Sequence, residues 1–558
     1  MRFRLLSKKA ANVSLILAIS AGVALSAAHL PNAEASTGKC SGINDSQVTH
    51  EINQIQGSGA ESPLVGKSVT TCGTVYAVEA KGYWIQDTTP DSDPATSEGI
   101  FVYKSNGVGN IKIGDIVRQK GYVQEYYGLT EINAKAEITK LGTGTVPAAA
   151  EITASMTYSN LESLEGMRVF VKSATVVAGT NKYNETFVVP GSTASRVART
   201  DTKTPLFKFD DVFGNVFTDA STFDTISGDP AGPLTYSFGA YGLLMNTGTA
   251  SVSDTGNTQN SLSADSSSQF TTATFNVENY FAVGSEVSPG DPGTKVTQQQ
   301  FDTKTAKLSL AIRNSIGSPD VAAVQEVEKI EVLNALASKI ASDGGPNYTA
   351  YLIEGSDERG IDNAYLVKEG TTVLSVEQKG KDATTTLEGC GPSNTNLLFS
   401  RPPLVLRVQT AAGQKIALIN NHFKSRGGDD PENKEFQSCR EAQAEYVANV
   451  ANAEASNGYD VIVLGDLNSF PEENVLAILQ TNANLTNLVQ NIPSDRAFSY
   501  IYTGRAQFLD HLLVGGALKT QATGTDSAKI NPDHPYSLET DASTPLHVSD
   551  HDPIRADF

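Results

Sequence analysis

The stretch Val461–Pro471 reads VIVLGDLNSFP, and it is the part of the chain that most directly indicates the fold. Its four leading apolar residues fit a strand that is buried on both faces. Asp466 and Asn468 follow at a spacing of two, which places both side chains on one face of an extended segment. Open sheets bind ligands at such strand ends. Asp and Asn also favour turns, so this stretch alone leaves a turn and a functional site equally open.

Polar residues end other apolar runs in the same half of the chain. From Thr271 onward, expected strands alternate with expected helices, which predicts a layered α/β or α+β domain. These strands lead into Asn276, Glu326, His422, Asp510 and the pair Asp550–His551. Carboxylates can hold a divalent metal, and a histidine can exchange protons near neutral pH. So many polar strand ends in one domain predict phosphoester hydrolysis better than turn chemistry does.

The motifs carry a family resemblance. In chain order they are NVEN, VQE, FSRPPL, NHFKSRGG, GDLN, LDH and SDHDP. This set resembles the endonuclease/exonuclease/phosphatase superfamily over Thr271–Phe558. The resemblance implies an α+β fold with a DNase I-like four-layer α/β sandwich as the catalytic domain. It also implies a divalent metal. Magnesium is favoured, and manganese and calcium suit the same oxygen ligands.

The resemblance also implies roles for single residues. Glu326 would be the principal metal ligand, with Asn276, Asp550 and Glu278 completing the site. Asp466 would orient or deprotonate water, and Asn468 would hold a phosphoryl oxygen. His551 would act at the scissile phosphate, steadied by Asp510, and His422 would assist the leaving oxygen. Asp362 is the nearest candidate for the carboxylate partner of His422, on a loose alignment.

Three cations are implied as phosphate contacts: Arg401, Lys424 and Arg426. Each proposed role has a structural alternative. His422 could be a core histidine, Asp510 could cap a helix, and Glu278 could be merely exposed. Arg401 could be a surface charge, and Lys424 and Arg426 could lie on a solvated turn. The joint occurrence in family order favours the functional reading of the core set.

The N-terminal residues predict export. Residues 1–35 combine a basic start, an apolar stretch and the cleavage pattern Ala33-Glu34-Ala35, which is typical of a secretory signal. An extracellular protein is expected, and a periplasmic location stays open. The four cysteines then favour disulfides, and proximity along the chain favours Cys40–Cys72 and Cys390–Cys439.

Residues 36–146 alternate in short runs separated by Gly or Asp, which fits a five-stranded OB-fold barrel. This segment resembles the OB-like domains that precede secreted nucleases. Its aromatic residues could stack single-stranded bases, although filling the barrel or covering its face is the favoured alternative. Residues 147–268 are expected to be a second β-rich domain followed by a linker over Ser251–Ser268, and the catalytic domain is expected over 269–558.

The formal net charge of −20 at pH 7 disfavours a static DNA coat but not an enzyme that cuts nucleic acid. The main expectation is a secreted, monomeric nuclease that cuts DNA, and RNA as a further substrate, with low sequence specificity. One alternative is a phosphatase or phosphodiesterase of the same superfamily, acting on other phosphoesters. A binding protein with an inactive scaffold is a third hypothesis. Neither an apolar hairpin nor a transmembrane segment follows the signal, so no membrane partner is expected.

Overall fold

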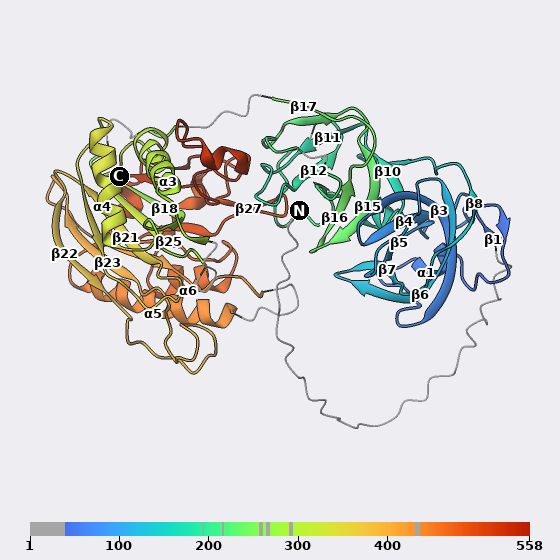
Figure 1. Cartoon of the computed structure of the whole chain (residues 1–558). Helices are drawn as coiled ribbons and strands as arrows, with labels where there is room; N and C mark the ends of the chain where they lie inside the picture. Colours follow the sequence, from blue (N-terminus) through green and yellow to red (C-terminus); the bar gives the residue numbers. More distant parts are fainter. Residues whose placement is uncertain are drawn as a thin grey trace, which may run out of the picture.

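The computed structural model describes residues 39–193, 195–214, 217–255, 261–263, 268–288, 294–429 and 436–558. The predicted signal peptide lies outside these residues. Figure 1 shows three sheet-rich parts in a row, with the blue N-terminal part at one end, the green part in the middle and the yellow-to-red part at the other end. Among the described helices, none has the length and apolar character needed to cross a bilayer.

The N-terminal part is a closed barrel. Its sheet has the order β3-β4-β5-β7-β6-β8, and β3 pairs with β6 as well, which closes five strands into a ring. The OB fold is a five-stranded barrel of this kind, although the OB assignment stays a prediction. The bounds are β3 (Ser68–Glu79), β4 (Gly82–Gln86), β5 (Gly99–Tyr103), β6 (Asp115–Tyr126), β7 (Leu129–Asn133), β8 (Thr139–Thr143) and helix α1 (Ile52–Gln56).

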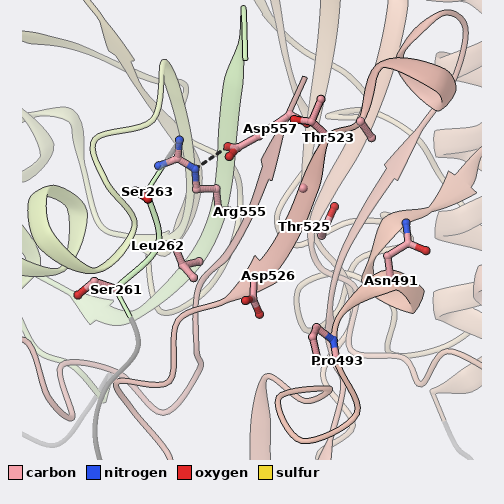
Figure 2. A pocket seen from close by; sticks show the side chains of 12 residues that line it. Ser261, Leu262, Ser263, Asn491, Pro493, Thr523, Thr525, Asp526, Arg555 and Asp557 are labelled. Carbon is pink, nitrogen blue, oxygen red and sulfur yellow. Dashed lines mark hydrogen bonds and ion pairs between the residues drawn. The ribbon is translucent and has the colours of Figure 1, made fainter. Parts of the chain in front are cut away.

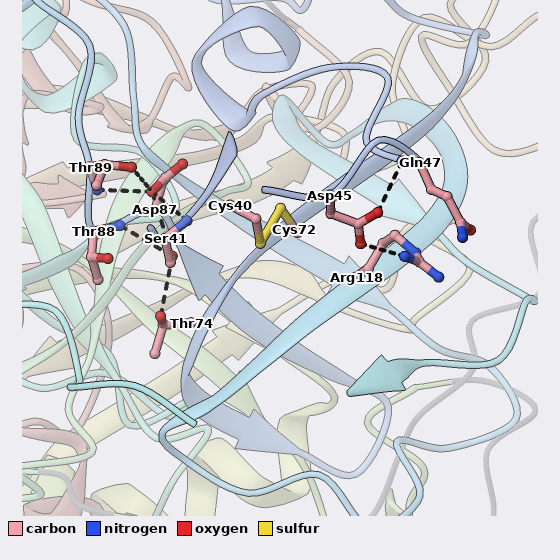
Figure 3. Close-up of a disulfide and its surroundings, with 10 residues drawn as sticks. All are labelled: Cys40, Ser41, Asp45, Gln47, Cys72, Thr74, Asp87, Thr88, Thr89 and Arg118. Carbon is pink, nitrogen blue, oxygen red and sulfur yellow. Dashed lines mark hydrogen bonds and ion pairs between the residues drawn. A yellow bond between two sulfur atoms is a disulfide. The ribbon is translucent and has the colours of Figure 1, made fainter. Parts of the chain in front are cut away.

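Both predicted disulfides are confirmed. Cys40–Cys72 ties the hairpin of β1 (Lys39–Cys40) and β2 (Ile43–Asn44) to strand β3, beside the Arg118–Asp45 ion pair (Figure 3). The second bond joins Cys390 to Cys439.

The aromatic residues of the barrel divide into two sets. Tyr83 is 0% exposed in the barrel core, and Trp84, which is 3% exposed, packs outside that core against Phe213 and Leu244 of the middle part, so neither ring can stack on bases. Tyr122, Tyr126 and Tyr127 are 62%, 58% and 61% exposed.

The middle part contains one nine-stranded sheet in the order β17-β14-β11-β12-β13-β16-β15-β10-β9. Ser251–Ser253 forms β17 and pairs with β14, so the predicted linker does not begin at Ser251. The bounds are β9 (Ala150–Glu151), α2 (Tyr158–Glu162), β10 (Arg168–Phe170), β11 (Ser173–Val176), β12 (Thr186–Pro190), β13 (Phe207–Asp210), β14 (Thr225–Ser227), β15 (Ala231–Ser237), β16 (Ala240–Leu244) and β17 (Ser251–Ser253).

The C-terminal part contains two six-stranded sheets. The first has the order β20-β21-β19-β18-β31-β30 and the second β22-β23-β24-β25-β29-β26. The bounds of the first are β18 (Thr271–Tyr280), β19 (Val321–Val327), β20 (Tyr348–Leu352), β21 (Asp362–Lys368), β30 (Gly524–Ser527) and β31 (Ile554–Asp557). Those of the second are β22 (Thr372–Gln378), β23 (Leu404–Gln409), β24 (Lys415–His422), β25 (Asp460–Asp466), β26 (Thr486–Asn487) and β29 (Asp510–Val514).

Three apolar cores hold four layers together, which confirms the predicted sandwich. One core joins the first sheet to the helices α3 (Gln298–Leu310) and α4 (Ile330–Ser342), and a second fills the space between the sheets. The third joins the second sheet to α5 (Gln437–Ser456) and α6 (Asn474–Asn482). Figure 1 shows the two helix pairs on opposite outer faces. The apolar run Leu397–Phe399 forms no strand in this described segment, where Leu397 makes only an isolated bridge to Thr384.

The remaining elements are short. They are the π-helix η2 (Ala311–Ser315), the 3-10 helices η3 (Leu488–Asn491) and η4 (Tyr536–Thr540), helix α7 (Leu518–Gln521) and the hairpin of β27 (Tyr500–Tyr502) and β28 (Arg505–Gln507). The β27–β28 hairpin contacts the middle part, because Ala506 bridges to Ala198 in parallel. Arg196 also forms a two-pronged ion pair with Asp533, at 2.7 and 2.9 Å.

Candidate active site

Three of the predicted residues form a row across the second sheet. His422 is the register partner of Asp466 in the parallel pair β24–β25, and Asp466 is the partner of Asp510 in the antiparallel pair β25–β29. Such partners point to one face of a sheet. His422 Nε2 lies 3.5 Å from Asp466 Oδ2, and all three side chains are at most 4% exposed.

The backbone around Asp466 is unusual. Gly465 has a φ of +128°, and a Cβ there would lie 2.0 Å from the carbonyl oxygen of Asn421, so only glycine fits. Asn468 has a φ of +48°, and its backbone N–H donates to Asp466 Oδ1 at 2.8 Å. The Asn468 side chain donates to the carbonyl of Phe423 at 3.3 Å. The tight turn therefore fixes the Asp466 carboxylate and the Asn468 amide as one unit.

The first sheet contributes Asn276 and Glu326 to the same place. Asn276 Nδ2 lies 3.4 Å from Glu326 Oε1 and 3.2 Å from Asp466 Oδ2, so this amide joins the two sheets. Glu326 Oε1 also lies 3.9 Å from His422 Nε2. The parallel pair β18–β19 has a register shift between Asn276 and Tyr280. Such irregularities redirect side chains, and they are frequent beside active sites.

The loop before β31 supplies His551. Its Nδ1 lies 2.6 Å from Asp510 Oδ2 and its Nε2 lies 3.9 Å from Asp466 Oδ2. Ser549 supports this loop, because its hydroxyl donates to the carbonyl of Asn276 at 2.7 Å and accepts the His551 N–H at 3.1 Å. Asn531 accepts the N–H groups of Val548 and Ser549. The structure thus brings together residues from six segments that are distant in sequence.

Electrostatics separate the two histidines. Burial lowers the pKa of His422 well below its usual value, and the charges of Arg401 and Arg359 lower it further. Burial also disfavours a charged His551, yet the carboxylates of Asp510 and Asp466 outweigh it and raise the pKa of His551 well above its usual value. The site therefore favours a neutral ring on His422 and a charged ring on His551.

The carboxylates crowd one another. Burial raises the pKa of Glu278 to about 8, and the negative charges of Asp550 and Glu326 contribute to this rise. Burial likewise raises the pKa of Asp466 to about 7, against the opposing effect of His551. Negative charge at this site is thus incompletely balanced by the protein.

Two different residue sets could hold a metal. Asp466, Asp510 and His551 each offer an atom within 4.8 Å of the others. Within the described residues, the predicted carboxylate ligands Glu326, Asp550 and Glu278 do not form a group at that spacing. The charges of Asp550 and Glu326 nevertheless both act on Glu278.

The predicted phosphate contacts are engaged elsewhere. Arg401 is 8% exposed and donates to the carbonyls of His422 and Phe423 and to Asp357 at 2.6 Å. Arg426 donates to both carboxylate oxygens of Glu473, at 3.0 and 2.8 Å. Lys424 Nζ lies 4.5 Å from the ring centre of Phe436. Arg401 and Arg426 thus hold the chain around His422 and Asn468 in place.

Asp362 is not paired with His422 in the structure. Asp362 Oδ1 accepts the Gly355 N–H at 2.7 Å, whereas His422 Nδ1 is buried without a hydrogen-bond partner among the described residues. The tentative pairing is therefore wrong. The sequence could not reveal this, because Asp362 begins β21 in the other sheet from His422.

Two further residues lie at the site and were not predicted. The ring of Tyr500 lies 4.8 Å from that of His551, measured between centroids. Arg359 Nη2 lies 3.8 Å from Glu326 Oε1, and its side chain is 40% exposed. Neither residue stands at the end of an apolar run, so the pattern that identified the others could not identify them.

A cavity of about 490 Å³ lies elsewhere, and Figure 2 shows Arg555, Asp557, Thr523 and Asp526 among its lining residues. No predicted site residue lines it. Its charges are paired, since Arg555 donates to Asp557 at 2.6 Å and Arg496 donates to Asp526. This cavity is not part of the candidate active site.

Comparison with known proteins identifies the C-terminal part. Residues 271–531 match the model of the Endonuclease/Exonuclease/phosphatase family. This part of the chain belongs to that family. Residues 153–254 match a domain of unknown function, DUF8508, which covers most of the middle sheet. No curated protein matches the chain.

Solved structures similar to the chain include the human Nocturnin catalytic domain with bound sulfate, at 13% identity and a TM-score of 0.34, covering 52% of this chain and 93% of that one. An endonuclease/exonuclease/phosphatase from Bacteroides vulgatus has 14% identity and a TM-score of 0.35, with coverages of 52% and 97%. TDP2 from Caenorhabditis elegans has 16% identity and a TM-score of 0.34, with coverages of 51% and 74%. At these identities and scores, the neighbours assign no activity to this chain.

Proposed function

We propose that this protein is a secreted, metal-dependent nuclease that hydrolyses phosphodiester bonds of extracellular DNA, and of RNA as a further substrate, with low sequence specificity. The observation that carries the proposal is the meeting of Asn276, Glu326, Asp466 and His551 at one place between two sheets. Family membership supports phosphoester chemistry, since this superfamily consists generally of phosphoester hydrolases.

We assign the metal to Glu326, Asn276, Asp550 and Glu278. The donors are carboxylate and amide oxygens, which suit magnesium, manganese or calcium. The crowded negative charge around Glu278 fits a cation at this position. A bound divalent cation would neutralise charge on the phosphoryl oxygens. The alternative group of Asp466, Asp510 and His551 fits less well, because the 2.6 Å contact from His551 Nδ1 to Asp510 occupies two of its donor atoms.

The remaining residues divide the chemistry between them. Asp466 aligns the attacking water and accepts its proton, and the adjacent Asn468 amide donates to a phosphoryl oxygen. His551, held by Asp510, acts at the scissile phosphate as a charged hydrogen-bond donor. His422, on the other side of Asp466, assists the leaving oxygen. The attack proceeds in one step, since no Ser or Cys nucleophile is assigned to the site.

Arg359 replaces Arg401 and Arg426 as the proposed phosphate contact. Its side chain is 40% exposed and lies 3.8 Å from Glu326 and 3.9 Å from Asp357, whereas Arg401 and Arg426 are 8% and 21% exposed and contact carboxylates at 2.6 and 2.8 Å. An accessible guanidinium can donate two hydrogen bonds to one phosphate. Lys424 remains a weaker candidate, near the ring of Phe436.

Export is part of the proposal. The predicted signal of residues 1–35 and two disulfides fit an oxidising compartment. The protein would then act on extracellular DNA as a monomer. Cell fractionation with detection of the mature chain, followed by size-exclusion chromatography, tests these two points.

The activity is tested with purified full chain and supercoiled plasmid. Nicking or degradation is expected with magnesium, manganese or calcium and should stop when EDTA is added. A His551→Gln variant, purified in the same way, controls for contaminating nucleases. Cutting without metal, or no cutting with any of the three metals, would contradict the proposal. A parallel panel with RNA, sphingomyelin and a phosphomonoester separates a nuclease from another phosphoesterase.

A further inference from the structure

A second cavity lies where all three parts of the molecule meet. Its volume is about 520 Å³, which is in the range of small-molecule sites. The barrel contributes Glu125 and Gly128, the middle sheet contributes Tyr236 and Tyr241, and the β27–β28 hairpin contributes Arg505. We call this space the junction cavity. It shares no lining residue with the candidate active site.

Tyrosine rings form one wall of the junction cavity. Tyr158 stacks on Tyr241 with a centroid distance of 6.5 Å, and Tyr236 meets Tyr241 edge to face at 5.0 Å. Two further rings stand beside the cavity in the chain, since Tyr127 precedes Gly128 and Phe238 precedes Gly239. These two rings stack at 5.2 Å and are 61% and 74% exposed. A ligand in the cavity would thus meet the side chains of Tyr158, Tyr236 and Tyr241.

The charge of the lining is negative. Glu61, Glu125 and Glu162 line the cavity, and Glu165 is buried close enough to Glu125 and Glu162 for their charges to affect it. Arg505 is the single cation among the lining residues, and it donates to the Asp201 carbonyl and to the Tyr158 hydroxyl. Burial raises the pKa of Glu162, and the charge of Glu125 adds to this rise. The carboxylates therefore repel one another and are not balanced by Arg505.

Two carboxylate oxygens lack a partner. Glu125 Oε1 accepts the Ser62 N–H and the Thr130 hydroxyl, but Glu125 Oε2 is buried without a hydrogen bond from any described residue. The same holds for Oε2 of Glu165, a residue that is 1% exposed. A buried carboxylate oxygen without a donor is costly, and positive charge in the adjacent cavity lowers that cost through the electric field.

We propose that the junction cavity binds a small organic cation with an ammonium head group. Aromatic faces attract such cations, and carboxylates complement their charge. A nucleotide or free phosphate would be repelled by the three lining carboxylates. The three tyrosine rings favour an organic cation over a bare metal ion, which would gain less from aromatic faces. The site is separate from the proposed nuclease activity.

The test uses choline as the probe and its uncharged carbon isostere, 3,3-dimethylbutan-1-ol, as the ligand control. Binding to the full chain is measured by calorimetric titration. Choline is expected to bind at least tenfold more tightly than the isostere. The double variant Glu125→Gln and Glu162→Gln removes two negative charges but keeps the shape of both side chains. Residue 162 can still accept the hydrogen bond from the Tyr241 hydroxyl. This variant should weaken choline binding at least tenfold. Glu137→Gln, an exposed carboxylate that does not line the cavity, should leave choline binding unchanged.

Several results would overturn the proposal. Equal affinity for choline and its isostere would show that positive charge is not recognised. Unchanged choline binding in the double glutamine variant would place the ligand elsewhere. No choline binding together with binding of a neutral trisaccharide would make the cavity a sugar site. Thermal unfolding of each variant confirms that it is folded. Plasmid cutting is measured separately, so a failure of the proposed nuclease activity does not affect the comparison of choline affinities.

Discussion

Replacing Asp510 with asparagine tests the pairing that we place at the centre of the site. Asp510 Oδ2 lies 2.6 Å from His551 Nδ1, and Asp510 is only 1% exposed, so it cannot touch the substrate. It acts as a positioning residue, through His551. The asparagine can still accept the His551 N–H with its amide oxygen, but without the negative charge.

The size of the effect follows from this change of hydrogen bond. Bonds to charged groups contribute about 1.5–3 kcal/mol and neutral ones about 0.5–1.5 kcal/mol. The difference of about 1–1.5 kcal/mol in the transition state corresponds to roughly a 5- to 13-fold lower kcat. KM should change less than about threefold, because only an interaction of the reacting state is removed. The metal concentration for half-maximal activity should stay the same.

The structure also predicts a cost in stability for this variant. Asp510 Oδ1 is buried without a hydrogen-bond partner among the described residues, so the new amide NH₂ would point into a place that offers no acceptor. An unsatisfied buried donor costs about 1–3 kcal/mol. Thermal unfolding should show this loss while the chain stays folded at the assay temperature. Asp343→Asn, at the C-terminal end of α4, is the matched control, because it also removes one carboxylate charge but lies in a Lys339 and Arg313 ion-pair cluster.

The assay is plasmid nicking at several substrate and metal concentrations. An unchanged kcat would refute the positioning role of Asp510. A rise of more than tenfold in the metal requirement would instead make Asp510 a metal ligand, as the group with Asp466 and His551 would require.

Further predictions follow from the same geometry. Glu326→Gln should raise the metal concentration for half-maximal activity at least tenfold, measured by magnesium titration of plasmid cutting, because a neutral amide replaces the proposed principal ligand. Replacing Cys390 and Cys439 with serine should lower the free energy of unfolding by about 4 kcal/mol, from the 49-residue separation that the bond closes, as measured by urea unfolding. Burial raises the pKa of Glu131 to about 7, so the folded barrel disfavours its ionised form, and stability should fall as the pH rises from about 4.5 to 7. Glu131→Gln should therefore raise the free energy of unfolding at pH 8 by up to about 3 kcal/mol, seen as a higher melting temperature, and should leave both unchanged at pH 4. An equal effect of Glu131→Gln at both pH values would contradict the titration argument.

The polar strand ends could be predicted from sequence because two local patterns meet there. A buried strand reads as an apolar run, and the residue that ends it has a fixed direction from the sheet. His422 and Asp466 satisfy this pattern, whereas Asp510 begins β29 instead of ending a strand, and the register of β24, β25 and β29 places the three side by side. The alternation of strands and helices predicted a layered domain, and the family resemblance implied its four layers.

The partners of the charged residues could not be predicted in this way. Arg401 pairs with Asp357, and Arg426 pairs with Glu473, across 44 and 47 positions. A sequence shows that a cation stands beside His422 but not whether a distant carboxylate already neutralises it. Arg359 is the reverse case, because the sequence does not single it out and yet its side chain lies at the site. It stands in a loop without a periodic pattern, and its guanidinium group is 3.8 Å from Glu326. Loop residues of this kind are placed by tertiary structure, so only the coordinates identify them.

Backbone strain gives a separate argument for the location of the site. Glu278, Asn279, Glu326 and Asn468 all have φ between +48° and +65°. Asparagine tolerates this left-handed conformation, but for glutamate it costs about 1–2 kcal/mol. Glycine would adopt it without that cost, so packing alone does not explain a carboxylate at Glu278 or Glu326. Strained residues cluster where the chemistry requires a particular side chain. Of the fifteen described non-glycine residues with positive φ, two are glutamates, and both are among the four residues that we assign to the metal.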